Sequence, residues 1–394
     1  MLNRLALTAC ALWALSGGVA AAESLKLGIS TTLSGAAAQW GITMDFVGHQ
    51  AADWINSHGG IKVDGKTYTV EVQSYDNKYT AQDGARVAQE MIGRAGIKYV
   101  VGALGTAPIR ATQSISERAG VILMNIAWGM ATKGPKFPYS FTTENTGREI
   151  IEPFFDYVHK QHPDAKTVAM INPNDATGKD VSELNGPAWR KLGVNVVADE
   201  FYERGTTDFS ALATKFAQLK PDIINVGMPP GDAGLAIRQL HTLGWKGVIV
   251  MESGSSPAQM WQIAGDAVEG AYIGGAADFA GPTATDVQRA LQAKATKDIN
   301  TDLTMVSMSV WDGMMALKKA METANSVDPK AVRDTLPKIV FESSWGPSAF
   351  GRADLYGSPQ QILLPVVISR ISQGKTVEVA RIPSAEFAAR ERKQ

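Results

Sequence analysis

The sequence has a single cysteine, Cys10, and it lies within the first 22 residues. A chain without further cysteine forms no internal disulfide and offers no thiol for catalysis or metal binding. An excess of charge of one sign is also lacking, because 38 basic and 39 acidic residues give a formal net charge of −1. This balance excludes the basic surface typical of a nucleic-acid-binding protein and the polybasic patch that binds acidic lipids.

Signatures of common enzymes are missing as well. The sequence contains no Gly-x-Ser-x-Gly elbow, no His-Glu-x-x-His pair, no P-loop and no Gly-x-Gly-x-x-Gly fingerprint. Of the five histidines, only His159 and His162 are closely spaced. They come at an expected helix end beside Pro163, where interaction with the helix dipole is favoured over metal binding. We therefore expect no cofactor, no metal ion and no enzymatic activity.

The first 22 residues have the pattern of an export signal. Arg4 supplies a positive start, an apolar run extends from Leu5 to Leu15, and Ala20-Ala21-Ala22 is a small-residue cleavage signal. The apolar run is shorter than the roughly 20 residues that span a bilayer, and no later segment is long and apolar enough. We expect residues 1–22 to be a signal peptide removed near Ala22, leaving a cysteine-free protein in the periplasm.

Strand-like and helix-like segments alternate over most of the remaining chain. A strand at Leu25–Thr31 precedes a helix at Ile42–Ser57, and the alternation restarts after Thr143 and continues to about Gly275. Several strands, such as Ile223–Val226, are apolar on both faces, which is typical of central parallel strands covered by helices. The pattern predicts an α/β fold with doubly wound parallel sheets. About 370 residues exceed what one core supports, so two lobes are expected.

The end of the chain breaks this alternation. Two helices are expected in succession, near Thr285–Lys297 and Thr304–Ala324. Strands are then expected at Gln361–Ile371 and Lys375–Ile382. Because this tail is too short for a third domain, it must pack onto the first two.

Ligands of open parallel sheets bind beyond the carboxyl ends of the strands, on the loops that lead into helices. Among these loops, Gly105-Thr106-Ala107-Pro108 is the best candidate for binding an anion. Thr106 can cap the following helix, and free N–H groups with the helix dipole would hold a carboxylate. The alternative is that Thr106 only caps its helix. Ser34 with Gly35 has the same chemistry and the same two interpretations.

Two tryptophans, Trp40 and Trp128, stand on expected loops, where no helical or strand periodicity calls for a large ring. A tryptophan there can cover the apolar body of a ligand or stack on an aromatic one. The alternative is that each ring packs against its own domain.

Two further loops offer carboxylates and hydroxyls. Asp175 with Thr177 provides an acceptor and a hydroxyl, and Glu252 with Ser253 provides the same pair of groups. Either acid could hold an ammonium or another N–H group. Loop carboxylates also serve as helix caps or stay solvated, so both interpretations remain open.

Taken in order, a series of short motifs resembles the branched-chain (Leu/Ile/Val) amino-acid-type substrate-binding proteins of ABC importers, and the resemblance covers the whole mature chain. The motifs are Leu27-Gly28-Ile29 before Leu33-Ser34-Gly35 and Gly41, Ala51-Ala52 with Ile55-Asn56 before Gly59-Gly60-Ile61, Asp76, Val101-Gly102 before Gly105-Thr106, Gly178-Lys179-Asp180, Asp208-Phe209-Ser210 and Phe350-Gly351. Their order and spacing are specific, although each motif alone is short.

The resemblance implies the type I periplasmic binding protein fold, with two lobes joined by three hinge crossings near Thr143–Gly147, Ala276–Gly281 and Phe350–Asp354. The N-terminal lobe would comprise residues 23–143 and 276–350, and the C-terminal lobe residues 144–275 and 351–394. The resemblance also implies a monomer that closes on a small molecule and delivers it to inner-membrane ABC permease subunits.

The family's amino-acid-binding residues match this sequence only in part. Thr106 matches the hydroxyl that holds the ligand carboxylate. The threonine that takes the ammonium group falls on Ala127 and Trp128, so that hydroxyl is missing.

In the second lobe, the expected aromatic residue before Gly178 is Thr177, and the ammonium-binding acid falls near Glu252 or Ser253. The resemblance thus implies an amino acid or a small organic carboxylate as ligand. The departures favour a carboxylate without an amine, of the aromatic class.

Two other functions remain open. A ligand-sensing receptor domain would share the fold, but no signalling segment follows the leader. A secreted hydrolase could use Asp175 or Glu252, and turnover of the ligand would distinguish it from a binding protein.

Overall fold

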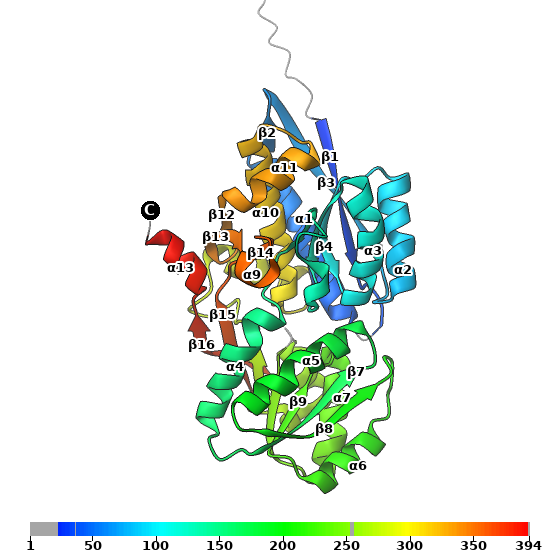
Figure 1. The fold of residues 1–394 in the computed structure, drawn as a ribbon, viewed down its shortest axis with the longest axis vertical. Helices are drawn as coiled ribbons and strands as arrows, with labels where there is room; N and C mark the ends of the chain where they lie inside the picture. Colours follow the sequence, from blue (N-terminus) through cyan, green and yellow to red (C-terminus); the bar gives the residue numbers. More distant parts are fainter. Residues whose placement is uncertain (1–22, 36, 253–255, 393–394) are drawn as a thin grey trace, which may run out of the picture.

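The computed structural model describes residues 23–35, 37–252 and 256–392. The expected signal peptide, residues 1–22, and the candidate ligand residue Ser253 lie outside the described residues. The described chain forms two α/β lobes, one above the other in Figure 1. None of the helices in this part of the chain combines the length and hydrophobicity that a membrane span needs.

The first lobe is built on a nine-stranded sheet of order β12-β13-β14-β6-β5-β4-β1-β3-β2. Its strands are β1 (Glu23–Thr31), β2 (Ile61–Val63), β3 (Lys66–Asp76), β4 (Tyr99–Leu104), β5 (Ile122–Ile126), β6 (Ser140–Thr142), β12 (Val340–Ser343), β13 (Gly346–Gly351) and β14 (Gln361–Ile362). Its helices are α1 (Ala38–Ser57), α2 (Ala81–Ala88, continued by a π-helical turn), α3 (Thr106–Ala119), α9 (Asp286–Ile299), α10 (Met305–Ala324), α11 (Pro329–Thr335) and the short α12 (Ala353–Tyr356).

The second lobe is built on a seven-stranded sheet of order β16-β15-β11-β10-β9-β7-β8. Its strands are β7 (Thr167–Pro173), β8 (Asn195–Tyr202), β9 (Ile223–Val226), β10 (Val248–Met251), β11 (Tyr272–Gly274), β15 (Val366–Ser372) and β16 (Lys375–Ile382). Its helices are α4 (Gly147–Gln161), α5 (Ala176–Lys191), α6 (Ser210–Leu219), α7 (Pro230–Thr242) and α8 (Pro257–Ala264), and the chain ends in α13 (Ala385–Glu391).

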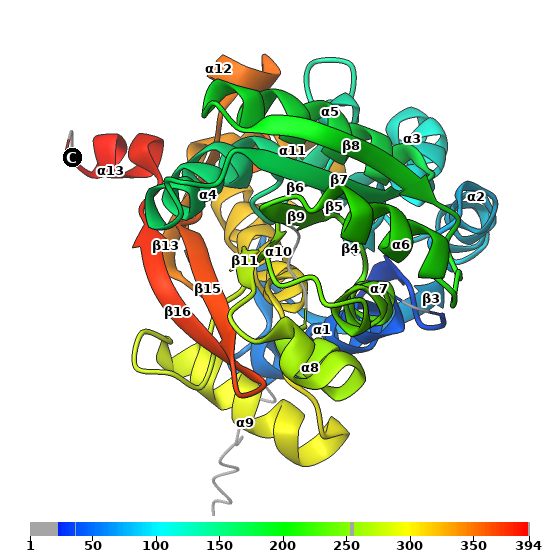
Figure 2. The ribbon, with the colours of Figure 1, turned by 90° about the horizontal axis from the view of Figure 1, so that it is seen from below.

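Both sheets are covered by helices on their two faces, which confirms the predicted doubly wound α/β fold. In the second lobe, α4 and α5 lie on one face and α7 and α8 on the other (Figure 2). Neighbouring residues of β9 point to opposite faces, since Ile223 packs with the α4–α5 side and Ile224 with the α6–α8 side. This arrangement explains why β9 carries apolar residues on both of its faces.

The strand expected at Gln361–Ile371 is two strands in different sheets, which is a correction to the sequence analysis. Gln361 pairs with Thr142 of β6 in the first sheet, whereas β15 begins at Val366 in the second. The third crossing therefore runs through residues 363–365, not near Phe350–Asp354, and residues 351–362 belong to the first lobe. In the sequence, the break is hidden within an apolar run, residues 362–368. Pro365 marks its position, because proline has no N–H to donate within a sheet.

The other two crossings lie between β6 and α4, at residues 143–146, and between β11 and α9, at residues 275–285. At the first crossing, α4 starts with a capping box in which Thr146 and Glu149 satisfy each other's backbone groups. In the first lobe, α1 approaches β1 closely because Gly41 has no side chain. A Cβ there would lie 1.7 Å from the carbonyl oxygen of Thr32.

Candidate functional site

A cavity between the lobes is lined from the carboxyl ends of both sheets, where the sequence analysis expected a ligand. Three aromatic residues of the first lobe, Trp40, Tyr79 and Trp128, form much of its wall. Its volume is about 30 Å³, which is room for one or two water molecules. A ligand the size of an amino acid or a benzene ring therefore enters only when the lobes separate by a hinge motion.

The two tryptophans reach the cavity in different ways. Trp40 is not on a loop, as the sequence analysis expected, because α1 begins at Ala38 and includes it in its first turn. Trp128 does lie on the loop after β5, and its ring packs into the core of the second lobe beside Ile150 and Ile151 of α4. Trp128 thus connects the two lobes at the cavity wall.

Thr106 is the first residue of α3 and is fully buried. Its hydroxyl has no hydrogen-bond partner among the described residues. The N–H groups of Thr106 and Ala107 start the helix and so lack intrahelical partners, whereas Pro108 has no N–H, so this helix end presents two backbone donors beside the hydroxyl. Thr106 itself does not line the cavity, but it follows Leu104, which does. A buried hydroxyl at a helix N-terminus is suited to binding a carboxylate when the lobes open.

Gly105 allows this close packing, because it adopts a φ of +93° and a Cβ there would lie 3.1 Å from Tyr79 Cζ. Tyr79 also adopts a positive φ, of 60°, a conformation that is costly for an aromatic residue. The buried amide of Asn77 stabilises this turn, since its Oδ1 accepts from the Tyr79 N–H at 2.9 Å and its Nδ2 donates to the Leu104 carbonyl at 3.1 Å. The strained backbone at Tyr79 therefore lowers the stability of the fold but holds the Tyr79 ring against the start of α3.

On the other side of the cavity, Arg204 extends from the loop after β8 and covers Tyr79. Its Cζ lies 4.1 Å from the centre of the Tyr79 ring, which is a cation–π contact between the lobes. Its Nε donates to Asp175 Oδ2 at 2.6 Å, and Asp175 Oδ1 accepts from the Gly178 N–H at 3.0 Å. Asp175 therefore caps α5 and orients Arg204, so both of its oxygens already have partners.

Thr177, in the first turn of α5, lines the cavity, and its buried hydroxyl has no hydrogen-bond partner among the described residues. The hydroxyl of Tyr79 is also buried. Burial raises the pKa of this hydroxyl, and the positive charge of Arg204 opposes the shift. Tyr79 is therefore a neutral phenol at neutral pH, available as a hydrogen-bond donor.

Glu252 lies in a fully buried polar cluster behind the second-lobe wall. Its Oε2 accepts from Asn225 Nδ2 at 2.5 Å, and Asn225 Oδ1 accepts from Trp189 Nε1 at 2.9 Å. Burial raises the pKa of the Glu252 carboxyl, which favours the protonated form. Glu252 Oε1 and both amide atoms of Asn172 have no partner among the described residues.

Gly227 separates this cluster from the cavity that it lines. A Cβ at this position would lie 2.1 Å from Asn172 Oδ1 and 2.9 Å from Glu252 Oε1. The cluster therefore lies within one atom layer of the cavity, and only glycine leaves that space open. These groups can donate to and accept from a second polar group of a ligand.

Six of the nine predicted site residues that the structure describes do not line the cavity, and two of these six make their contacts elsewhere. Ser34 is exposed, and its hydroxyl donates to Asp76 Oδ2 at 2.7 Å. Ala127 is fully buried in a separate cluster with residues of α2, α3 and β4. The structure therefore brings together Trp40, Trp128, Thr177 and, behind the wall, Gly105, Thr106 and Glu252.

Sequence reasoning missed Tyr79, Arg204 and Asn172. Asn172 is the next-to-last residue of β7, and the other two residues follow strands, so the rule that ligands bind at the carboxyl ends of parallel strands could have found them. They were missed because a tyrosine, an arginine or an asparagine near a strand end is common on protein surfaces.

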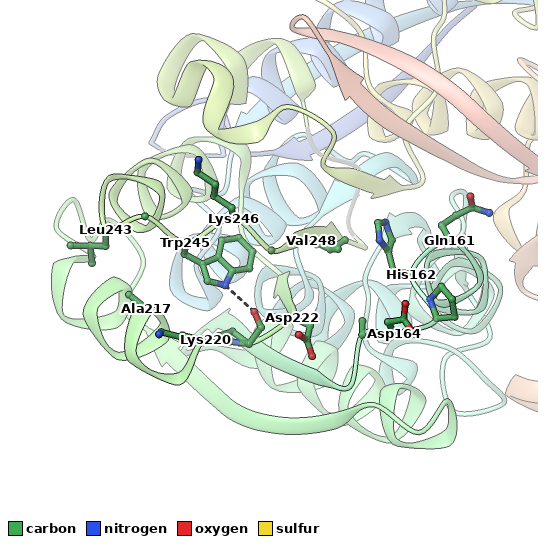
Figure 3. A pocket seen from close by; sticks show the side chains of 15 residues that line it. Gln161, His162, Asp164, Ala217, Lys220, Asp222, Leu243, Trp245, Lys246 and Val248 are labelled. Atoms are coloured by element: carbon green, nitrogen blue, oxygen red, sulfur yellow. Dashed lines mark hydrogen bonds between the residues drawn. The ribbon is translucent and has the colours of Figure 1, made fainter.

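A larger cavity, of about 600 Å³, lies at the opposite end of the second sheet, beside the amino ends of β7, β9 and β10 (Figure 3). Two of its polar side chains hold the surrounding loops together. Trp245 Nε1 donates to the Pro221 carbonyl at 2.9 Å, and Asp222 Oδ2 accepts from the N–H groups of Lys166 and Thr167, both at 2.9 Å. None of the predicted site residues lies there, so this cavity is a surface groove between connecting loops.

An ion pair also connects the two lobes. Arg110 Nη2 of α3 lies 3.0 Å from Asp180 Oδ2 of α5, and the two side chains are 38% and 20% exposed. Because the pair forms only when the lobes meet, we expect Arg110→Ala and Asp180→Ala each to weaken ligand binding by about two- to fivefold, with a coupling of about 0.2–1 kcal/mol. A double-mutant cycle by titration calorimetry measures this coupling, and additive effects of the two substitutions would contradict it.

Comparison with known proteins places this geometry in a family. The model of a family described as periplasmic binding protein matches residues 24–363. The chain is similar to Leu/Ile/Val-binding protein homolog 3 of Brucella melitensis, with 28% identity over 314 residues that cover 79% of this chain and 82% of the relative.

Two solved structures share the fold. A leucine-binding protein of Thermotoga maritima has a TM-score of 0.79 with 19% identity and covers 92% of this chain and 99% of its own. A solute-binding protein of an ABC transporter from R. palustris, in complex with benzoate, has a TM-score of 0.78 with 16% identity and covers 92% and 97%.

Proposed function

Because the chain belongs to the periplasmic binding protein family, we propose that it captures a small aromatic carboxylate between its lobes and delivers it to the permease subunits of an inner-membrane ABC importer. The proposal includes export to the periplasm with removal of residues 1–22, action as a monomer, and release of the ligand chemically unchanged. The family's members are binding proteins, and catalysis by this chain is not part of the proposal.

The observation that carries the proposal is the unused hydroxyl of Thr106 at the N-terminus of α3, beside a cavity walled by three aromatic rings. The helix end favours a negative group, and the rings of Trp40, Tyr79 and Trp128 favour a flat apolar body. A benzoate-like acid combines these two features in one small molecule.

Other contacts argue against an α-amino acid. Both oxygens of Asp175 already have partners, so this carboxylate is not available to an ammonium group. Glu252 remains as an acid, but burial favours its neutral form, which suits a hydroxyl or amide better than a cation. We therefore assign the carboxylate to Gly105 and Thr106, the ring to the aromatic wall, and a second polar substituent to Asn172 and Glu252.

The fold alone does not choose the ligand. Relatives of this chain are named for leucine, isoleucine and valine, and a structural neighbour of nearly the same TM-score holds benzoate. The residues at the cavity therefore determine whether an aliphatic amino acid or an aromatic acid binds.

A thermal-shift panel tests the proposal with benzoate, 4-hydroxybenzoate, leucine and isoleucine. A ligand present at about one hundred times its Kd should add about 2.7 kcal/mol to the free energy of unfolding and raise the melting temperature. We expect the aromatic acids to raise it and the aliphatic amino acids to leave it unchanged. A shift with leucine or isoleucine and none with any aromatic acid would contradict the proposal. Chromatography of the ligand after incubation tests the binding role separately, because chemical conversion of the acid would contradict it.

A further inference from the structure

We infer that Arg204 is a specificity-determining residue that makes binding depend on the negative charge of the ligand. This inference rests on the proposed function, because it concerns how the same cavity selects a carboxylate over an uncharged compound of the same shape. Of the described residues that line the cavity, Arg204 alone is charged. The charge is permanent, since a guanidinium does not lose its proton in proteins.

The structure holds this guanidinium in place from two sides. Asp175 takes the Nε donor at 2.6 Å, and the Tyr79 ring lies below Cζ at 4.1 Å. Arginine has five N–H donors in a rigid planar arrangement. The ion pair with Asp175 uses one of them and leaves the two terminal amino groups for other acceptors.

Arg204 also acts on the side of the cavity where the carboxylate is assigned. The Tyr79 ring lies against Gly105, 3.1 Å from the position of a Cβ there, and Gly105 directly precedes α3. Arg204 lies on that same ring. The start of α3 and the guanidinium are thus separated by little more than one aromatic ring, so both positive groups attract the same anion.

Asp175 does not cancel this attraction. Its Oδ1 accepts from the Gly178 N–H at the start of α5, so its negative charge lies at the positive end of that helix. Because Arg204 is largely buried between Tyr79 and Asp175, its field is screened less than that of an exposed arginine.

Calorimetric titration with benzoate and benzamide tests the inference, because the two compounds share their shape and differ in charge. We expect the wild-type protein to bind benzoate more tightly than benzamide, and Arg204→Gln to reduce this preference by about tenfold or more, mainly through weaker benzoate binding. Arg204→Lys keeps the charge and should retain part of the preference. The matched control is Lys215→Gln, which removes a lysine of the same lobe that pairs with Glu200 at 2.6 Å away from the cavity.

Two outcomes overturn the inference: an unchanged preference in Arg204→Gln, or an equal loss of affinity for both compounds, which would mean that Arg204 only holds the lobes together. If the wild-type protein binds none of the aromatic acids of the thermal-shift panel, the proposed function fails on its own. The comparison is then repeated with the acid and amide of the panel compound that binds, and the same two outcomes decide the role of Arg204.

Discussion

Replacing Thr106 by valine is expected to weaken binding of a carboxylate ligand by about 10- to 100-fold, while the protein without ligand becomes more stable. The loss of affinity follows from removing a hydrogen bond to a charged group, which contributes about 1.5–3 kcal/mol. Valine keeps the shape of threonine, so the path to the cavity stays the same. Calorimetric titration with the ligand found in the thermal-shift panel measures the loss.

Thr106→Val is expected to weaken ligand binding but to stabilise the free protein, and this combination distinguishes a ligand-binding hydroxyl from a helix cap. The Thr106 hydroxyl is fully buried and has no partner among the described residues. A buried polar group without a partner costs about 1–3 kcal/mol, so its removal should raise the free energy of unfolding by roughly 1 kcal/mol. A residue that only capped its helix would instead lose stability on substitution.

Ser116→Ala provides the matched control for Thr106→Val. Ser116 lies on the same helix, and its hydroxyl is also fully buried without a partner among the described residues. It is nearly three turns from the helix N-terminus, so its removal should change stability but leave the affinity unchanged. Equal affinities of wild type and Thr106→Val would place the carboxylate elsewhere in the cavity.

The alternation of apolar runs predicted the fold because each half of the chain is a series of strand–helix units. Strand β9 is apolar at three of its four positions since Ile223 and Ile224 pack on opposite faces, and this pattern is visible in the sequence. The pattern failed at Gln361–Ile371, where one run without polar side chains, residues 362–368, joins β14 to β15 although the two strands belong to different sheets. Only hydrogen-bond pairing, which is long-range, assigns Ile362 to Phe350 and Val366 to Ile382.

The sequence predicted those site residues that belong to a short local motif. It did not predict those whose contacting residues come from distant segments of the chain. Gly105 with Thr106 has a local signature, because a glycine and a hydroxyl before a proline predict a helix start. The contact between Tyr79 and Arg204 joins residues 125 positions apart from two lobes, and no spacing rule connects them. Likewise, Asp175 has a carboxylate that could bind a ligand, but its two oxygens accept hydrogen bonds from the Gly178 N–H and from Arg204.

The first hinge crossing contains a buried carboxyl that should make stability depend on pH. Glu144 is 1% exposed, and it faces Asp312 of α10, which is fully buried. Burial, with the nearby Asp312, raises the pKa of Glu144 from 4.5 to about 8, and burial raises that of Asp312 to about 7. Glu144 Oε2 and Asp312 Oδ2 have no hydrogen-bond partner among the described residues.

The sign of the effect follows from proton binding. With a folded-state pKa above the unfolded value, the folded protein holds more protons between about pH 4.5 and pH 8. The free energy of unfolding therefore falls as pH rises through this interval and levels off above it. Each unit of pKa shift corresponds to about 1.4 kcal/mol, so the total loss from Glu144 amounts to several kcal/mol.

Glu144→Gln should remove the part of this slope that Glu144 contributes, leaving that of Asp312, and raise the free energy of unfolding at pH 8 by about 3 kcal/mol, because glutamine remains neutral in the same space. The backbone carbonyl of residue 144 keeps its hydrogen bond from Gln361 Nε2, which is 2.7 Å long in the wild type. Urea unfolding at several pH values measures the slope. The control is Glu342→Gln on β12, an exposed glutamate of the same lobe, which should leave it unchanged. Parallel curves for wild type and Glu144→Gln would mean that Glu144 is ionised in the folded protein, and the buried carboxyl would then need a positive partner at the hinge.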